Sequence, residues 1–208
     1  MQNNSFAIAW HGGDNEGSTR TRLQIFAPDK TKQGPEKAPN IRNTGQMAMT
    51  FLDPNAGSEP GRFVLAHTIR GDGEQELLVA TVFSPAGDVL HQFNVTHRDG
   101  DGIAGQPAAA AAPGQRFRIA WSERFLPEIG DQTGDNIKVR LFGENDGALQ
   151  TAADVASTAG DQRSPCIVTI VAPDSGVRTG MAWLDDAGVV GNKRKIKATV
   201  LGGPLNPG

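Results

Sequence analysis

The sequence contains few of the residues on which many protein chemistries depend. Its 208 residues include one cysteine, no tyrosine and three tryptophans. A single cysteine cannot form an intrachain disulfide, and we expect Cys166, which lies among isoleucines and valines, to be a buried and unreactive thiol. The shortage of tyrosine and tryptophan leaves few aromatic platforms on which sugar rings could stack.

The net charge is also small, and long hydrophobic segments are absent. The formal net charge is −3, which argues against nucleic acid and against an anionic membrane surface as electrostatic partners. The apolar runs are far shorter than the roughly 20 residues that a membrane-spanning helix needs, so we predict no membrane insertion. The amino-terminal residues Met1–Ser5 have neither a basic residue nor an apolar core, and no signal peptide is visible.

The familiar motifs of catalysis are absent as well. No nucleophile elbow, Walker loop or dinucleotide fingerprint occurs. The four histidines lack the spacing of zinc ligands, and no two carboxylates stand out as a glycosidase pair. These histidines are His11, His67, His91 and His97. We therefore predict that the chain is not an enzyme, and we assign no catalytic, cofactor-binding or metal-binding residue.

What the chain does contain is one short phrase, Phe-x-aliphatic-Ala-Trp, in four copies. The copies begin at Phe6, Phe63, Phe117 and Thr179. The intervals between them are 57, 54 and 62 residues, and a period of this length indicates a repeated supersecondary unit. We expect the repeated aromatic residues to be buried at equivalent places: Trp10, Trp121, Trp183, Phe63, Phe83, Phe117 and Phe142. His67 replaces the tryptophan of the second copy, so a core role is expected for it in preference to that of a general base.

Each repeat contains further segments that are typical of β-strands. They are short, most are rich in β-branched and aromatic residues, and Gly, Pro, Asp or Asn bound them. A second segment ends at Phe26, Phe83, Phe142 and, in degenerate form, Leu201. A third segment covers 90–96 and 149–155, with a faint version at 38–42. A fourth begins near Gln46, Gln106 and Gln162.

The polyalanine run Ala108–Ala112 is an exception to this pattern of residue types. Alanine has the highest intrinsic helix propensity, which favours a helix here. Five residues between Pro107 and Pro113 are too few to form a stable helix, however. We therefore predict a strand that packs against a crowded neighbour.

A repeat of about 55 residues that contains four strands matches the size and strand number of a β-propeller blade. We predict an all-β fold, a small propeller-like ring of about four repeats of four antiparallel strands, with an open β-repeat array or a β-sandwich as alternatives. The single repeat domain covers 1–208, with repeats at approximately 1–45, 46–105, 106–160 and 161–208. The first and last repeats each lack an edge strand. We therefore expect them either to share one composite sheet or to be completed by a partner.

Acidic, glycine-rich loops raise the question of calcium binding. They are Asp14–Gly17, Asp72–Glu74, Asp99–Gly102 and Asp131–Asn136. Calcium takes six to eight oxygen ligands, and none of these loops has the spacing of an EF-hand. The Asp-Gly pair is also a frequent hairpin signal. We expect these loops to form turns and predict no cofactor, with Ca²⁺ as the alternative.

The order of the repeated elements resembles a known group of bacterial repeats. The best-matching stretch runs from Gly87–Val95 through Gly105–Pro107 to Phe117–Trp121. It is similar to the roughly fifty-residue repeats of large secreted adhesins and hemolysin-type calcium-associated proteins. The resemblance implies a structural and binding module located outside the cell, on a cell surface or on a virion, and it offers no catalytic residue to carry over.

Two functions remain after these exclusions. The first is a non-catalytic structural, assembly or adhesion module on a cell surface or virus particle, acting by protein–protein association, with self-association through the terminal strands. The alternative is a lectin-like recognition module that holds a glycan in loops on one face. The loops after the repeated phrase differ in length and sequence, which weakens a model of one sugar in each repeat. We therefore favour the first function.

Overall fold

The computed structural model describes eleven ranges of the chain, and these contain strands and no helix. The ranges are 5–13, 19–38, 45–53, 61–70, 76–96, 103–124, 134–145, 147–156, 160–171, 177–186 and 194–201. The strands form four antiparallel sheets, each built from consecutive segments of the chain. Within these ranges there is no helix that could cross a membrane.

The first two sheets cover the amino-terminal half of the chain. The first has the order β1 (Phe6–Gly13), β2 (Thr19–Phe26) and β3 (Lys32–Lys37). The second has the order β4 (Met47–Leu52), β5 (Arg62–Arg70), β6 (Glu76–Phe83) and β7 (Val89–Asn94). The third strand of the first sheet lies before the faint segment expected at 38–42, because the turn at residues 27–30 starts β3 earlier; most of that expected segment lies outside the described residues. Residues 39–44 lie outside the described ranges.

The third and fourth sheets follow the same plan. The third contains β8 (Ile103–Ala112), β9 (Arg116–Arg124) and β10 (Asp135–Gly143), and its outer position is divided between β11 (Gly147–Ala148) and β12 (Ala153–Ala156). The fourth contains β13 (Gln162–Val171), β14 (Val177–Asp185) and β15 (Lys195–Leu201). The polyalanine run lies in β8 and pairs with β9, which confirms the predicted strand.

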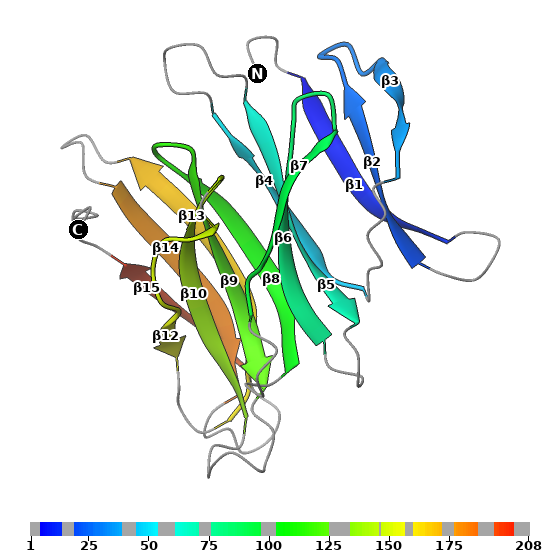
Figure 1. Cartoon of the computed structure of the whole chain (residues 1–208). Coiled ribbons are helices and arrows are strands. Elements are labelled where there is room, and N and C mark those ends of the chain that lie inside the picture. The colour runs from blue at the N-terminus through cyan, green and yellow to red at the C-terminus, as the bar shows by residue number, and fades with distance from the viewer. Residues whose placement is uncertain are drawn as a thin grey trace.

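The four sheets lie face to face in sequence order, like successive blades of a propeller (Figure 1). This arrangement confirms the predicted all-β, propeller-like fold of antiparallel repeats. Among the described residues the terminal repeats do not share a composite sheet, since β1 pairs with β2 and β15 with β14. The first and last sheets instead lie at opposite ends of the row in Figure 1.

Each sheet has two faces that differ in the residues of the repeated phrase. The first, third and fifth residues lie on one face, here named the aromatic face; in the third sheet they are Phe117, Ile119 and Trp121, all buried. The second and fourth residues lie on the opposite face, here named the alanine face. It carries the alanine of every copy: Ala9, Ala66, Ala120 and Ala182. The separation follows from the two-residue period of side chains in a strand.

The core forms where the alanine face of one sheet packs against the aromatic face of the next. In the first cluster Leu23 and Ile25 of β2 pack with Phe63, Leu65 and Phe83 of the second sheet. The second cluster joins Leu52, Val64, Ala66, Leu78, Ala80 and Val82 to Phe117, Ile119, Trp121 and Phe142. The third joins Ala110, Ala120, Ile137 and Val139 to Ile167, Met181 and Trp183. One directional interface is therefore repeated three times along the chain.

Burial bears out most of the expected core and corrects two positions. Trp121, Trp183, Phe63, Phe83, Phe117 and Phe142 are buried, as the repeat predicts. Trp10 is half-buried, because it lies on the aromatic face of the first sheet. The expectation of a buried Cys166 is wrong: the residue is exposed on the alanine face of the last sheet. Hydrophobic neighbours in sequence do not bury a strand residue whose face has no sheet packed on it.

Candidate functional site

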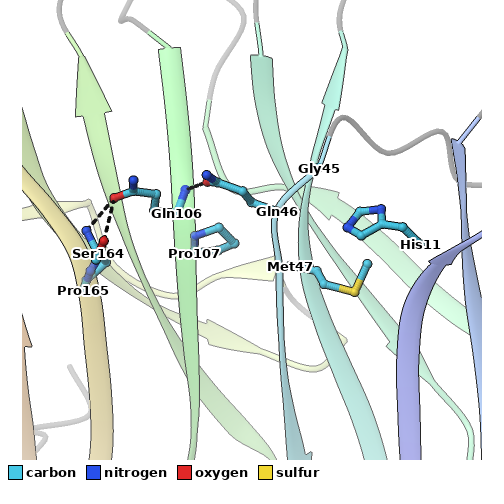
Figure 2. Close-up of a pocket in the computed structure, with 8 residues that line it drawn as sticks. All are labelled: His11, Gly45, Gln46, Met47, Gln106, Pro107, Ser164 and Pro165. Carbon is cyan, nitrogen blue, oxygen red and sulfur yellow. Dashed lines mark hydrogen bonds between the residues drawn. The ribbon is translucent and has the colours of Figure 1, made fainter.

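A cavity of about 460 Å³ lies where the four sheets approach one another at their first strands. Its described lining comes from every sheet: His11 on β1, Gly45, Gln46 and Met47 at the start of β4, Gln106 and Pro107 on β8, and Ser164 and Pro165 on β13. Figure 2 shows these residues in a row that crosses from sheet to sheet. The cavity is therefore a product of the stacking of the sheets and belongs to no single repeat.

Gln106 and Ser164 occupy equivalent positions in successive sheets. Each precedes a proline, and each lies in a β-bulge where the pairing register with the next strand shifts. Their φ angles are 49° and 51°, in the left-handed region that non-glycine residues rarely adopt. Because proline cannot donate to the ladder, the strand bends at this point and turns the preceding side chain toward the cavity.

This equivalence corrects the sequence alignment of the fourth segment. The sequence aligned Gln162 with Gln106, but the residue at that place in the fourth sheet is Ser164. Gln162 is instead wholly buried, and its Nε2 donates to the carbonyl oxygen of Gly160 at 2.9 Å. Gln46 stands at the corresponding place in the second sheet, directly before the pair that Met47 makes with His67.

A chain of hydrogen bonds links these three equivalent positions (Figure 2). The backbone N–H of Gln106 donates to the Oε1 of Gln46. The Oε1 of Gln106 in turn accepts from the backbone N–H of Ser164 at 2.5 Å and from its hydroxyl at 3.4 Å. Both donors are N–H groups, so each amide must present its oxygen to the neighbouring strand. The –NH₂ group of each glutamine then takes no part in this chain of hydrogen bonds and can donate to a molecule in the cavity.

His11 adds an imidazole at the other end of the row. Both of its ring nitrogens are buried, and neither has a hydrogen-bond partner among the described residues. Figure 2 places the ring beside Met47, at the side of the cavity formed by the first sheet. A buried imidazole without a partner can offer one donor and one acceptor to a molecule that enters the cavity.

His67 lies behind the cavity and has a structural role. It is fully buried, and its Nε2 lies 3.1 Å from the Oγ1 of Thr81. Burial lowers its pKa from 6.5 to about 4, with a smaller contribution from the nearby His11. The ring is therefore neutral at pH 7 and packed in the position of a repeat tryptophan, as the sequence predicted.

The buried carboxylates of the described residues are held in ion pairs away from the cavity. Glu123 lies 2.6 Å from Lys138, and Glu144 lies 3.0 Å from Arg62. A further buried carboxylate, Asp185, pairs with Lys197. None of the eight described lining residues is Asp or Glu. The described part of the cavity thus offers neutral hydrogen-bonding groups in place of acids.

Asp135 is the described acidic side chain of a loop that raised the question of calcium. Its carboxylate accepts from Arg124 at 2.8 Å and from Arg163 at 3.1 Å. This interaction raises the pKa of Arg124 and engages both oxygens of the carboxylate. No group of three His, Cys, Asp or Glu within the described ranges could hold a metal ion. The loops Asp14–Gly17, Asp72–Glu74 and Asp99–Gly102 lie outside these ranges, as does His97.

A second cavity, of about 470 Å³, lies between strands β2 and β3 of the first sheet and the turn that joins β6 to β7 in the second. It is lined by Ile25, Gln33, Gly34, Pro35, Lys37, Pro85 and Ala86. The lysine is engaged by Asp88 at 2.8 Å. This cavity does not touch the row of equivalent polar residues, and it supplies control positions for experiments on the first.

Comparisons with known proteins identify the fold. No family model matches the chain, and no curated protein matches it. Among solved structures it is similar to the alpha-L-arabinanase of Penicillium chrysogenum complexed with arabinobiose, with a TM-score of 0.51 and 10% identity over 95% of this chain and 71% of that one. It is also similar to the GH93 alpha-L-arabinofuranosidase of Fusarium graminearum in complex with arabinobiose, with a TM-score of 0.53 and 11% identity over 95% and 72%. At these identities the similarity establishes the propeller fold alone.

These neighbours contradict the expected function of a non-catalytic structural, assembly or adhesion module. The proteins that share the fold over most of this chain are glycoside hydrolases, two of them solved with arabinobiose bound. The repeated phrase did not predict the function because its residues determine how the sheets pack on one another. The same packing is compatible with loops and first strands that bind very different ligands. The expected location on a cell surface or virion rested on the same resemblance and stays a prediction.

Proposed function

We propose that this chain binds a neutral carbohydrate in the cavity between its four sheets. The observation that carries the proposal is the row of polar residues at the first strands of the four sheets. This row ends at His11, whose buried imidazole has no hydrogen-bond partner among the described residues. The propeller fold shared with arabinobiose-bound enzymes supports a sugar as the ligand class. This proposal takes up the lectin-like alternative drawn from the sequence.

The chemistry of the lining suits a ligand rich in hydroxyl groups. The amides of Gln46 and Gln106 have oxygens held by backbone donors, which leaves their –NH₂ groups to donate to sugar oxygens. His11 can both donate and accept. Pro107 and Pro165 add apolar surface against which the C–H face of a sugar ring can pack. No described lining residue is a carboxylate, lysine or arginine, so the cavity favours an uncharged ligand.

The same lining supports binding without hydrolysis. A glycosidase of the usual kind needs two carboxyl groups about 5–10 Å apart across the scissile bond. The described lining has none, and the buried carboxylates Glu123, Glu144 and Asp185 are neutralised by cations elsewhere. We therefore retain the proposal that the chain is not an enzyme, and we place its function in recognition.

Isothermal titration with arabinobiose, xylobiose and cellobiose tests the proposal. We expect at least one of these neutral disaccharides to bind and His11→Ala to weaken its binding about tenfold, the effect of roughly 1.4 kcal/mol of lost hydrogen bonding. Gln33→Ala, in the second cavity, is the matched control and should leave the affinity unchanged. Circular dichroism melting should show both variants folded, because neither side chain belongs to the core clusters.

Three results would contradict the proposal. One is a folded chain that binds none of the disaccharides or their soluble polysaccharides. Another is binding that His11→Ala leaves intact while Gln33→Ala removes it, which would move the site to the second cavity. Release of reducing sugar from soluble arabinan by the wild-type chain would overturn the absence of hydrolysis.

A further inference from the structure

The repeated interface between the sheets leaves one aromatic face free at the start of the row. In the first sheet this face carries Phe6 and Ile8, beside the half-buried Trp10. Phe6 is 38% exposed, whereas Phe63, which occupies the same position in the second sheet, is 3% exposed. Phe6 stacks on Phe26 with the ring centroids 5.2 Å apart, and no described sheet packs on this pair. The same face carries Gln24 opposite Ile8 and Arg22 opposite Trp10.

At the opposite end of the row, no described sheet packs on the alanine face of the last sheet. The pairing register of β14 and β15, and of β13 after its bulge, places ten residues on it: Cys166, Val168, Ile170, Arg178, Gly180, Ala182, Leu184, Ile196, Ala198 and Val200. One of the ten, Arg178 opposite Ile170 near the start of β14, is charged. Ile196 is 79% exposed, whereas Ile137, at the same position in the third sheet, is fully buried under the fourth sheet. Val168, Ile170 and Val200 are exposed as well.

These two faces are the two halves of the interface that the chain makes three times within itself. Inside the chain, an alanine face is always covered by the aromatic face of the following sheet. The free alanine face of the last sheet has the same residue types at the same register as the buried ones. Its complement, the free aromatic face, lies at the far end of the same molecule (Figure 1).

We propose that a second copy of this chain docks head to tail, with its first sheet packed on the last sheet of its neighbour. The contact is heterologous: the aromatic face of one copy covers the alanine face of the other, as at the three interfaces within the chain. An exposed and largely apolar face of three strands is the kind of surface that marks a protein interface. The proposal concerns the two ends of the row and is independent of the carbohydrate cavity.

Two substitutions, one at each face, test the direction of the contact. Ile8→Asp places a charge on the free aromatic face, and Ile196→Asp places one on the free alanine face. Both side chains are exposed, so each variant should fold with a melting temperature close to that of the wild type. Leu90→Asp, on β7 and similarly exposed, is the matched control.

Sedimentation equilibrium over a range of concentrations gives the readout. The wild type and Leu90→Asp should self-associate, and Ile8→Asp and Ile196→Asp should each remain monomeric. An equimolar mixture of Ile8→Asp and Ile196→Asp should form a one-to-one dimer, because one intact aromatic face and one intact alanine face remain to pair. A wild-type chain that stays monomeric overturns the proposal. So does an association that Ile8→Asp retains and Ile196→Asp loses, since that result would mean that two alanine faces pair with each other.

Discussion

The Nη1 of Arg118 on β9 donates a hydrogen bond to the Oγ1 of Thr179 on β14, across the interface between the third and fourth sheets. Thr179 is fully buried and stands at the phrase position that phenylalanine occupies in the other three copies. Arg118 stands where the first two copies have alanine and valine, and burial lowers its pKa, with Arg116 adding to the effect. The two departures from the repeat therefore compensate for each other.

Replacing Thr179 should destabilise the fold, because Arg118 would lose its hydrogen-bond acceptor. Thr179→Val keeps the shape and removes the acceptor, and hydrogen bonds to charged groups contribute about 1.5–3 kcal/mol. We expect a loss of that size in the free energy of unfolding, measured by urea titration. In an Arg118→Met background the same change should cost much less. Equal costs in both backgrounds would show that the hydrogen bond contributes nothing.

The aromatic repeat provides a second prediction, based on two phenylalanines with similar local contacts. Phe117 stacks on Phe142 at 5.4 Å and Phe6 stacks on Phe26 at 5.2 Å. Phe117 is covered by the second sheet, whereas no sheet in the described part of the chain covers Phe6. We expect Phe117→Ala to lower the unfolding free energy by about 3–5 kcal/mol. Phe6→Ala should cost about half of that or less, at concentrations where the chain is monomeric.

Equal costs for Phe117→Ala and Phe6→Ala would contradict the three-interface description of the core. They would mean that the aromatic face of the first sheet is covered within the monomer. Urea titration of the two variants beside the wild type, with the same denaturant dependence in all three, is sufficient for the comparison.

The repeat predicted the strands and the core because both depend on local pattern. Residues such as Phe117 and Trp121 recur at one position, and any sheet with neighbours on both sides buries that position. The same reasoning failed for Cys166, whose exposure depends on whether another sheet follows in space. A sequence period predicts which residues recur in each repeat. It does not predict whether another sheet covers the first or the last repeat of the row.

The candidate site was beyond the sequence for a different reason. Its residues are far apart in the chain, and the two bulges that align Gln106 with Ser164 shift the register by amounts that a strand pattern does not display. The available signal was the proline that follows each of them, Pro107 and Pro165. Aligning the repeats on these prolines, in place of the glutamines, would have placed Ser164 in the row.

Buried His67 leads to a prediction about pH. Its pKa is about 4 in the folded chain, below the 6.5 of an exposed histidine, because burial disfavours the imidazolium. The unfolded state therefore binds the extra proton first. Stability from this group is complete above pH 6.5 and is lost as the pH falls toward 4. The loss is on the order of 3 kcal/mol, from the conversion of about 1.36 kcal/mol for each pKa unit.

A comparison of variants separates the contribution of His67 to the pH dependence of stability from that of carboxylates, which gain protons over an overlapping pH range. Urea titrations at several pH values between 6.5 and 4 should show a steeper decline for the wild type than for His67→Gln, which has no proton to gain. His91→Gln, at an exposed position, should decline like the wild type. If His67→Gln declined as steeply as the wild type, His67 would not be the group responsible.

The hydrogen-bond chain between the inner strands leads to the last prediction. The N–H of Gln106 donates to the Oε1 of Gln46 across two sheets, so its exchange with solvent should depend on a side chain 60 residues away. Gln46→Ala removes the acceptor and should speed exchange at the Gln106 amide. Gln46→Glu keeps an acceptor oxygen and should preserve the protection, as measured by hydrogen exchange with NMR detection. The Ser164 amide, which depends on Gln106, should change little in either variant. Unchanged exchange at Gln106 in Gln46→Ala would mean that the sheets are aligned by core packing alone.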